Sequence, residues 1–253
     1  MTSLQYHRPQ SLDEALELLQ EGVPLAGGTR LTANLRGIEA LVDLQDLPLD
    51  QIEVTESTLE FGGTATLQGL MDNASQLPEA LVQAARLEAG WNIRNRATVA
   101  GTIVTGDGRS PLLTVLLALG AELELAPGDE RISLADALDQ GEDRTGGKLI
   151  TAIRAAISSQ LKYAQVARSP VDRPQICVAV AAFDSDTPVR IAIGGYGTRP
   201  QLVSMDEDLS IEDAADNART VYAKAGDQWA SADYRSSAAA TLVSRLLTEV
   251  AAE

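Results

Sequence analysis

Cysteine and histidine are almost absent from this chain. Its 253 residues include one cysteine, Cys177, and one histidine, His7. An intramolecular disulfide is therefore impossible, and this chain alone cannot build a cysteine-ligated iron–sulfur cluster or a structural zinc site. A Ser-His-Asp triad would have to use His7, near the N-terminus and beside Pro9, which argues against one. We expect no metal site and no catalytic residue on this chain, and we interpret Cys177 as a small core residue.

Positive charge and long apolar runs are also scarce. Twenty lysines and arginines stand against 36 aspartates and glutamates, which gives a net charge of −16. Nucleic acids and anionic membranes attract basic patches, so the composition argues against both as partners. No signal-peptide pattern is visible, and no apolar run approaches the roughly 20 residues of a membrane span. With 45% hydrophobic residues, the chain is predicted to be a soluble, cytoplasmic, globular protein.

Small residues and hydroxyls are concentrated in residues 94–121. Three glycines there have no Cβ to hinder a ligand: Gly101, Gly106 and Gly108. The apolar residues 111–119 predict a helix, with Ser110 as its cap and Pro111 in its first turn. A loop of this kind that leads into a helix suits an anion or a dinucleotide, and it equally fits a tight turn between a strand and a helix.

A second glycine-rich stretch favours the ligand-binding interpretation over the tight turn. Residues 24–31 read Pro-Leu-Ala-Gly-Gly-Thr-Arg-Leu. Together the two stretches resemble the FAD-binding medium subunit of the molybdenum hydroxylases, as in carbon monoxide dehydrogenase and the flavin domain of xanthine dehydrogenase. The first loop of that family is typically Ala-Gly-Gly-Thr, which occurs here at residues 26–29.

The second loop of the family is typically Ile-Arg-Asn-x-Ala-Thr-Ile-Gly-Gly-Asn, followed by Ser-Asp and by an apolar helix that ends in Ala-Leu-Gly-Ala. The matching positions here are Ile93, Arg94, Asn95, Ala97, Thr98, Gly101, Ser110 and residues 118–121. The resemblance continues to both ends of the chain, at Tyr6, Pro9, Tyr163, Arg168, Gly194, Gly195, Asp233, Tyr234 and Arg235. It therefore spans essentially the whole sequence.

The patterns predict an α+β fold in two parts. By resemblance, residues 1–157 form an FAD-binding α/β domain of the vanillyl-alcohol-oxidase (PCMH) type, made of two subdomains with the loops at 24–31 and 94–111. Residues 158–253 are expected to form a three-stranded antiparallel sheet packed on helices. The strands are predicted at 4–7, 23–26, 40–44, 52–54, 59–62, 121–126, 149–157, 161–168, 175–183 and 189–195, with a turn at 184–188. The helices are predicted at 11–20, 31–36, 64–73, 79–89, 111–119, 134–138, 211–224 and 236–250.

The resemblance also implies the cofactor site. Backbone amides of the two loops would hold the FAD pyrophosphate and ribityl chain, with hydroxyls from threonines. The isoalloxazine would face the second domain, near Tyr163 and Gln165. The expected cofactor-binding residues are Pro24, Leu25, Ala26, Gly27, Gly28, Thr29, Arg30, Leu31, Thr98, Val99, Ala100, Gly101, Thr102, Asp107, Ser110, Tyr163 and Gln165.

Three positions depart from the family pattern. Gly-Gly-Asn is replaced by residues 100–102, Ala-Gly-Thr; the aspartate of Ser-Asp is replaced by Pro111; and a strand lysine is replaced by Gln165. Asp107 is either a substitute for the missing carboxylate or a solvated turn residue. Arg30, where relatives carry acidic or small residues, either pairs with a phosphate or is solvated.

Two functions follow from these observations. In the first, the chain is the FAD-binding electron-transfer subunit of a molybdenum hydroxylase, and it passes electrons between iron–sulfur clusters of a partner and an external acceptor. Molybdopterin and [2Fe-2S] clusters are then expected only on partners, a molybdenum-cofactor large subunit and an iron–sulfur small subunit. In the second, the chain has lost FAD and serves as a structural or assembly subunit. A free-standing flavin oxidase is a third, weaker alternative.

Overall fold

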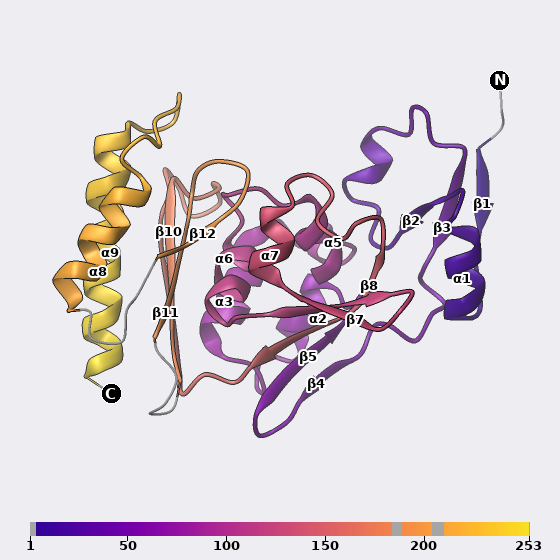
Figure 1. Ribbon diagram of the computed structural model, residues 1–253, viewed down its shortest axis with the longest axis horizontal. Coiled ribbons are helices and arrows are strands. Elements are labelled where there is room, and N and C mark those ends of the chain that lie inside the picture. The colour runs from indigo at the N-terminus through magenta and orange to yellow at the C-terminus, as the bar shows by residue number, and fades with distance from the viewer. Residues whose placement is uncertain (1–3, 184–188, 204–209, 253) are drawn as a thin grey trace.

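The computed structural model describes residues 4–183, 189–203 and 210–252, and it contains three sheets with helices between and around them (Figure 1). The first sheet is parallel and has the order β1 (Gln5–His7), β3 (Ala40–Asp43), β2 (Val23–Leu25). Helix α1 (Leu12–Leu18) connects β1 to β2, as a crossover between parallel strands must. The 3-10 turn η1 (Leu31–Ala33) follows β2.

Helix α1 begins as predicted, with one difference at its cap. The side chain of Ser11 accepts a hydrogen bond from the Glu14 backbone N–H, which satisfies one of the unpaired donors of the first turn. The Glu14 carboxylate, however, accepts from the backbone N–H of Gln10 at 2.8 Å rather than from that of Ser11. In a capping box Glu14 would accept from Ser11, so here the reciprocal bond is displaced by one residue.

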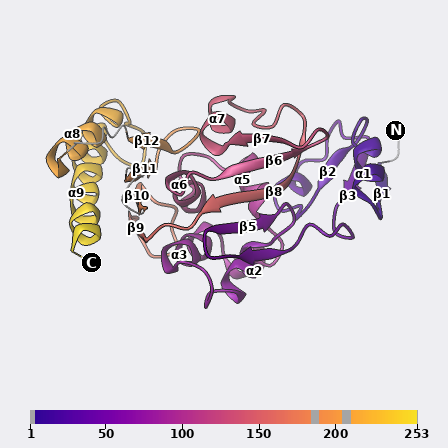
Figure 2. The same cartoon turned by 60° about the horizontal axis from the view of Figure 1, so that its bottom comes forward.

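The second sheet is antiparallel and has the order β4 (Ile52–Val54), β5 (Thr58–Gly62), β8 (Leu149–Ala156), β6 (Glu122–Ala126), β7 (Glu130–Ser133). Figure 2 shows β5, β8, β6 and β7 side by side. Strand β8, predicted at residues 149–157, lies at the centre of this sheet. Strand β7 was not predicted, because its sequence Glu-Arg-Ile-Ser lacks a clear apolar alternation.

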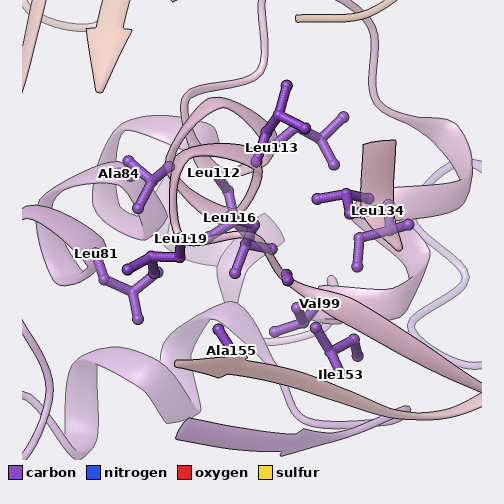
Figure 3. Packing of buried hydrophobic residues seen from close by; sticks show 14 of the residues in the cluster. Leu81, Ala84, Val99, Leu112, Leu113, Leu116, Leu119, Leu134, Ile153 and Ala155 are labelled. Atoms are coloured by element: carbon purple, nitrogen blue, oxygen red, sulfur yellow. The ribbon is translucent and has the colours of Figure 1, made fainter. Parts of the chain in front are cut away.

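Helices cover this second sheet and form the largest core. They are α2 (Leu67–Asp72), α3 (Glu79–Glu88), α4 (Trp91–Arg94), α5 (Val99–Thr105), α6 (Pro111–Ala118) and α7 (Leu134–Asp139). Every residue of α6 is buried, and its leucines meet residues of α3, α5 and β8 (Figure 3). A helix that is apolar on all sides needs cover on all sides. Helix α6 has that cover because it lies between the second and third sheets.

The third sheet is antiparallel, in the order β12 (Gln201–Val203), β11 (Arg190–Gly194), β10 (Ile176–Ala182), β9 (Gln160–Val166). Side chains of β10 alternate between two cores: the larger Ile176, Val178 and Val180 face α8 (Ile211–Val221) and α9 (Ala232–Ala251), whereas the small Cys177, Ala179 and Ala181 face α6. Alternation along a strand produces this division.

The third sheet has one more strand than predicted. The three predicted strands are present, but the sheet has a fourth strand, β12, which the sequence did not predict. Two of the three residues of β12 are exposed, so it shows no apolar pattern. The turn expected at 184–188 lies outside the described residues.

The segment at 98–102 was predicted as a loop, and this prediction was wrong. Thr98 is the N-cap of α5, whose first residues are the small Val99, Ala100 and Gly101. The short run contains too few large apolar residues to show a helical period.

Within the three described ranges, no helix is long and apolar enough to cross a membrane.

Candidate functional site

A cavity of about 400 Å³ lies where the first sheet meets α5 and β8. Both glycine-rich stretches line it, although they are about 70 residues apart in the sequence. The predicted residues that line it are Pro24, Ala26, Gly27, Gly28, Thr29, Arg30, Leu31, Ala100, Gly101 and Thr102. Its volume falls within the range of roughly 300–1,000 Å³ that is usual for ligand pockets.

Gly27 is the point at which the two stretches touch. A Cβ added to Gly27 would overlap the backbone carbonyl of Arg96, so no other residue fits without moving one of the loops. The next residue, Gly28, has φ +70°, a left-handed conformation that favours glycine. Its carbonyl accepts hydrogen bonds from the backbone N–H and the hydroxyl of Thr32, at 3.0 and 2.7 Å, which fixes the following turn.

Backbone hydrogen bonds to residues at the start of α2 hold the second stretch in place. Leu67 N–H donates to the Ala97 carbonyl and Val99 N–H donates to the Ala65 carbonyl, both at 2.9 Å. Thr98 accepts from Gly101 N–H at 3.0 Å, and the Thr102 hydroxyl donates to the Thr98 carbonyl at 2.9 Å. In this structure the Thr102 hydroxyl proton is therefore used within α5.

A third segment, between the helix predicted at 134–138 and the strand predicted at 149–157, closes the cavity. It contributes Thr145, Gly147 and Lys148 to the lining. Arg144 anchors it: this guanidinium is buried and donates to the carbonyls of Ile103, Gly106 at 2.7 Å and Thr198 at 3.2 Å. The sequence signal available for this segment was the pair of adjacent glycines in Thr-Gly-Gly-Lys at 145–148. Both glycines have a positive φ in the structure.

Glu88 is a charged residue of this site that was not predicted from the sequence. It lies at the end of α3 and lines the cavity. Its Oε2 accepts hydrogen bonds from the Ser110 hydroxyl at 2.7 Å and from Leu112 N–H at 3.1 Å, at the start of α6. Burial raises the pKa of Glu88 above its ordinary value. The one local signal was an acidic residue in the last turn of a helix, where the helix dipole disfavours negative charge.

Seven predicted residues do not line the cavity: Leu25, Thr98, Val99, Asp107, Ser110, Tyr163 and Gln165. Leu25 is in β2, Val99 is in the main core, and Ser110 caps α6 as predicted. Tyr163 and Gln165 are in β9, where the Tyr163 hydroxyl donates to Gln165 Oε1 at 2.8 Å. Burial raises the pKa of the Tyr163 hydroxyl well above its ordinary value.

Asp107 has a partner other than a ligand. Its carboxylate forms an ion pair with Arg173, including a 2.9 Å hydrogen bond from Nη1 to Oδ2, and accepts from Arg109 N–H at 2.8 Å. Burial opposes ionisation, but these hydrogen bonds prevail and lower the pKa of Asp107. Arg109 in turn donates to the carbonyls of Arg173 and Pro174. The carboxylate therefore fixes the loop after α5 to the segment before β10.

Gly108 packs against the chain that follows β11 and does not line the cavity. A Cβ at this position would overlap the carbonyl of Tyr196, and backbone hydrogen bonds join Gly108 to Gly195 and Gly197. Of the three glycines singled out in residues 94–121, Gly101 and Gly106 line the cavity and Gly108 does not.

The cavity wall is mostly backbone and apolar surface, with few charges. Two cations lie on it, Arg30 and Lys148. Lys148 forms an ion pair with Glu130. Arg30 is exposed and has no ion-pair partner among the described residues. This wall suits an elongated, partly apolar anion with a negative centre.

Comparisons with known proteins agree with this geometry. Residues 2–155 match the family described as the FAD binding domain in molybdopterin dehydrogenase. The uncharacterized protein YgfM of Escherichia coli (strain K12) is 34% identical, and the match covers 82% of this chain and 80% of YgfM. The carbon monoxide dehydrogenase medium chain of Afipia carboxidovorans is 33% identical over 61% of this chain and 59% of its own length. This chain therefore belongs to the family of FAD-binding domains of the molybdopterin dehydrogenases.

Solved structures extend the likeness beyond the first 155 residues. A chain in the crystal structure of the Cu,Mo-CO dehydrogenase superposes with a TM-score of 0.81 at 25% identity, and the match covers 96% of this chain and 95% of that chain. The expected fold class, an α+β flavin-binding fold followed by an antiparallel sheet with helices, is thus confirmed. The chain is an FAD-binding medium subunit of the molybdenum hydroxylase family.

Proposed function

We propose that this chain holds FAD in the cavity between residues 24–31 and 97–106 and passes electrons between iron–sulfur clusters of a partner subunit and an external acceptor. The observation that carries the proposal is the cavity itself, because two glycine-rich segments far apart in the sequence line one space. The bound flavin supplies the redox chemistry, and the protein binds, orients and tunes it.

The residues of the cavity fit FAD. Any side chain at Gly27 would overlap Arg96, and the left-handed Gly28 turns the chain beside the cavity wall. Backbone N–H groups of these residues and of Ala100, in the first turn of α5, are suited to the pyrophosphate, and the side chain of Arg30 offers a cation for its charge. The apolar part of the wall, which includes Ile93 and Val104, is suited to a ring system.

The remaining expected contacts are part of the same proposal. The isoalloxazine would extend towards β9, where Tyr163 and Gln165 lie, and Leu25, Thr98, Val99 and Ser110 would support the site from behind its wall. We also propose that residues 1–157 form the FAD-binding domain and that residues 158–253 form a C-terminal domain of antiparallel sheet and helices.

The names of relatives support the choice of partners. Besides the carbon monoxide dehydrogenase medium chain, the nicotine 6-hydroxylase medium subunit of Paenarthrobacter nicotinovorans is 27% identical over 100% of this chain. A medium subunit implies larger and smaller companions, so we propose a molybdenum-cofactor large subunit and a [2Fe-2S] small subunit as partners.

The test is the visible absorbance of the pure protein, isolated alone and with its partner subunits. We expect bound flavin and a rise in melting temperature when FAD is added, because a ligand that binds only the folded state stabilises it. Well-folded protein that shows neither, with or without partners, would instead support the alternative of a structural subunit that has lost FAD.

A further inference from the structure

Only one of the two carboxylate oxygens of Glu88 has hydrogen-bond partners among the described residues. Oε2 accepts both of its hydrogen bonds, from Ser110 and Leu112, whereas Oε1 accepts none from the described residues. No described cation forms an ion pair with Glu88. A carboxylate has room for about four hydrogen bonds, so this half-buried carboxylate has capacity for another donor at Oε1.

The position of Glu88 has no explanation in helix α3. An acidic residue in the last helical turn is unfavourable next to the exposed carbonyls of that turn. Burial adds to this cost, because it disfavours the charged form. The side chain is nevertheless directed at Ser110, and Glu88 is one of the residues that line the cavity.

We propose that Oε1 of Glu88 accepts a hydrogen bond from an N–H or O–H group on the flavin half of FAD, so that this glutamate is a cofactor-binding residue. The inference rests on the proposed function. The flavin half is chosen because α3 packs against β9, the strand towards which the isoalloxazine would extend, whereas the glycine-rich wall suits the pyrophosphate.

This role makes flavin affinity depend on pH. The ionised carboxylate is the better acceptor, so affinity falls as the pH is lowered through the pKa of Glu88, which burial places above the ordinary glutamate value. The titratable groups that face Glu88 are Arg173 and Asp107, Tyr163 on β9 and Cys177 on β10. Of these, Asp107 also titrates in acid, so a variant of Glu88 itself is needed to assign the effect.

The experiment measures the affinity of the full-length, flavin-free chain for four probes: FAD, riboflavin, lumiflavin and ADP. The variant is Glu88→Gln, and the matched control is Glu79→Gln, an exposed glutamate in the first turn of the same helix. We expect Glu88→Gln to weaken FAD and riboflavin roughly ten- to a hundred-fold, as for loss of a hydrogen bond to a charged group. ADP affinity should stay unchanged, and the loss of affinity in acid should disappear.

Lumiflavin distinguishes the two possible donors, because it has the ring but no ribityl chain. A weaker affinity of Glu88→Gln for lumiflavin assigns the bond to a ring N–H, and an unchanged one assigns it to a ribityl hydroxyl. The control should match the wild type with every probe.

Other outcomes overturn the inference. Unchanged FAD affinity in a folded Glu88→Gln variant, or equal losses for FAD and ADP, would leave Glu88 with only the structural role of capping α6. A wild-type chain that binds none of the flavins refutes the proposed function as well, which separates the two failures. If Glu88→Gln does not fold, Glu88→Asp replaces it: the shortened carboxylate should weaken riboflavin but retain the acid-dependent loss, and unchanged riboflavin affinity would contradict the proposal.

Discussion

Gly27 and Arg96 are in direct backbone contact, so that a methyl group on Gly27 would lie 1.9 Å from the Arg96 carbonyl oxygen and overlap it. The two residues belong to the two glycine-rich segments that line the cavity. This contact sets how closely the segments approach, and it therefore sets the shape of the cavity between them.

The first prediction follows from this contact. Gly27→Ala should separate the two segments, lower the free energy of unfolding by roughly 1–3 kcal/mol, as overpacking does, and weaken FAD binding. Thermal unfolding with and without FAD measures both effects.

Gly90→Ala is the matched control for that variant. Gly90 precedes α4, its φ is negative, and a Cβ there meets nothing within 4 Å. We expect Gly90→Ala to bind FAD like the wild type. Equal behaviour of the two alanine variants would show that the close contact at Gly27 does not shape the site.

The second prediction concerns Gly28, which has φ +70° and lines the cavity. Gly28→Glu or Gly28→Asp should abolish FAD binding, because a carboxylate would enter the proposed phosphate site with charge of the same sign. Gly37→Glu is the control, since Gly37 has φ +79° but does not line the cavity. Both variants carry a similar backbone strain of about 1–2 kcal/mol, so similar melting temperatures with FAD binding lost only in Gly28→Glu would locate the phosphate. Retention of FAD by Gly28→Glu would place the phosphate elsewhere.

Local signals in the sequence predicted much of the fold. Ser110 and Pro111 marked the start of α6, and the alternation of large and small side chains in β10 fits a strand buried on both faces. The resemblance also predicted that two distant loops share a cavity, because relatives have the same pair of loops.

Contacts between segments far apart in the sequence could not be predicted in this way. Glu88 reaches Ser110 from 22 residues away, Arg144 reaches Ile103 from 41, and Arg173 reaches Asp107 from 66. Each side chain is polar, and no local pattern in the sequence identifies its partner. Its partner is decided by how the sheets and α6 pack, which periodicity along the chain does not record.

The third prediction concerns the ion pair of Asp107 with Arg173. Asp107→Asn should destabilise the fold by about 0.5–1 kcal/mol, a modest amount because both side chains are more than a third exposed. FAD affinity should barely change, since Asp107 does not line the cavity. If affinity instead falls by about 1–3 kcal/mol, Asp107 is the substitute carboxylate that the sequence analysis considered.

The stabilising effect of Asp107 has a defined pH dependence. Its pKa in the folded protein is lower than its ordinary value of 3.8. Its contribution is therefore complete above that ordinary value and disappears as the pH falls through the lowered pKa. Urea unfolding at a series of pH values should show the wild type and Asp107→Asn converging in acid. Asp172→Asn, an exposed aspartate one residue before Arg173, is the control and should unfold like the wild type throughout.

The last prediction concerns Arg235, one of the residues that carry the resemblance near the C-terminus. Its side chain is fully buried in α9. It donates to the carbonyls of Gln175, Ala225 and Ala230 at 2.6–3.0 Å and pairs with Asp227 at 2.9 Å. The guanidinium therefore joins α9 to the start of β10 and to the loop that follows α8.

Arg235→Ala should cost about 3–5 kcal/mol, because it leaves three carbonyls without their donor and Asp227 without its cation. Arg235→Lys should recover only part of this loss, since an ammonium cannot reproduce the planar fork of donors. The control is Arg245→Ala on the same helix, where the side chain is 55% exposed and lies 3.6 Å from Glu249; it should change stability by less than about 0.5 kcal/mol. Urea unfolding measures all three variants. A loss for Arg235→Ala no larger than that for Arg245→Ala would mean that apolar packing, rather than this guanidinium, holds α9 to the third sheet.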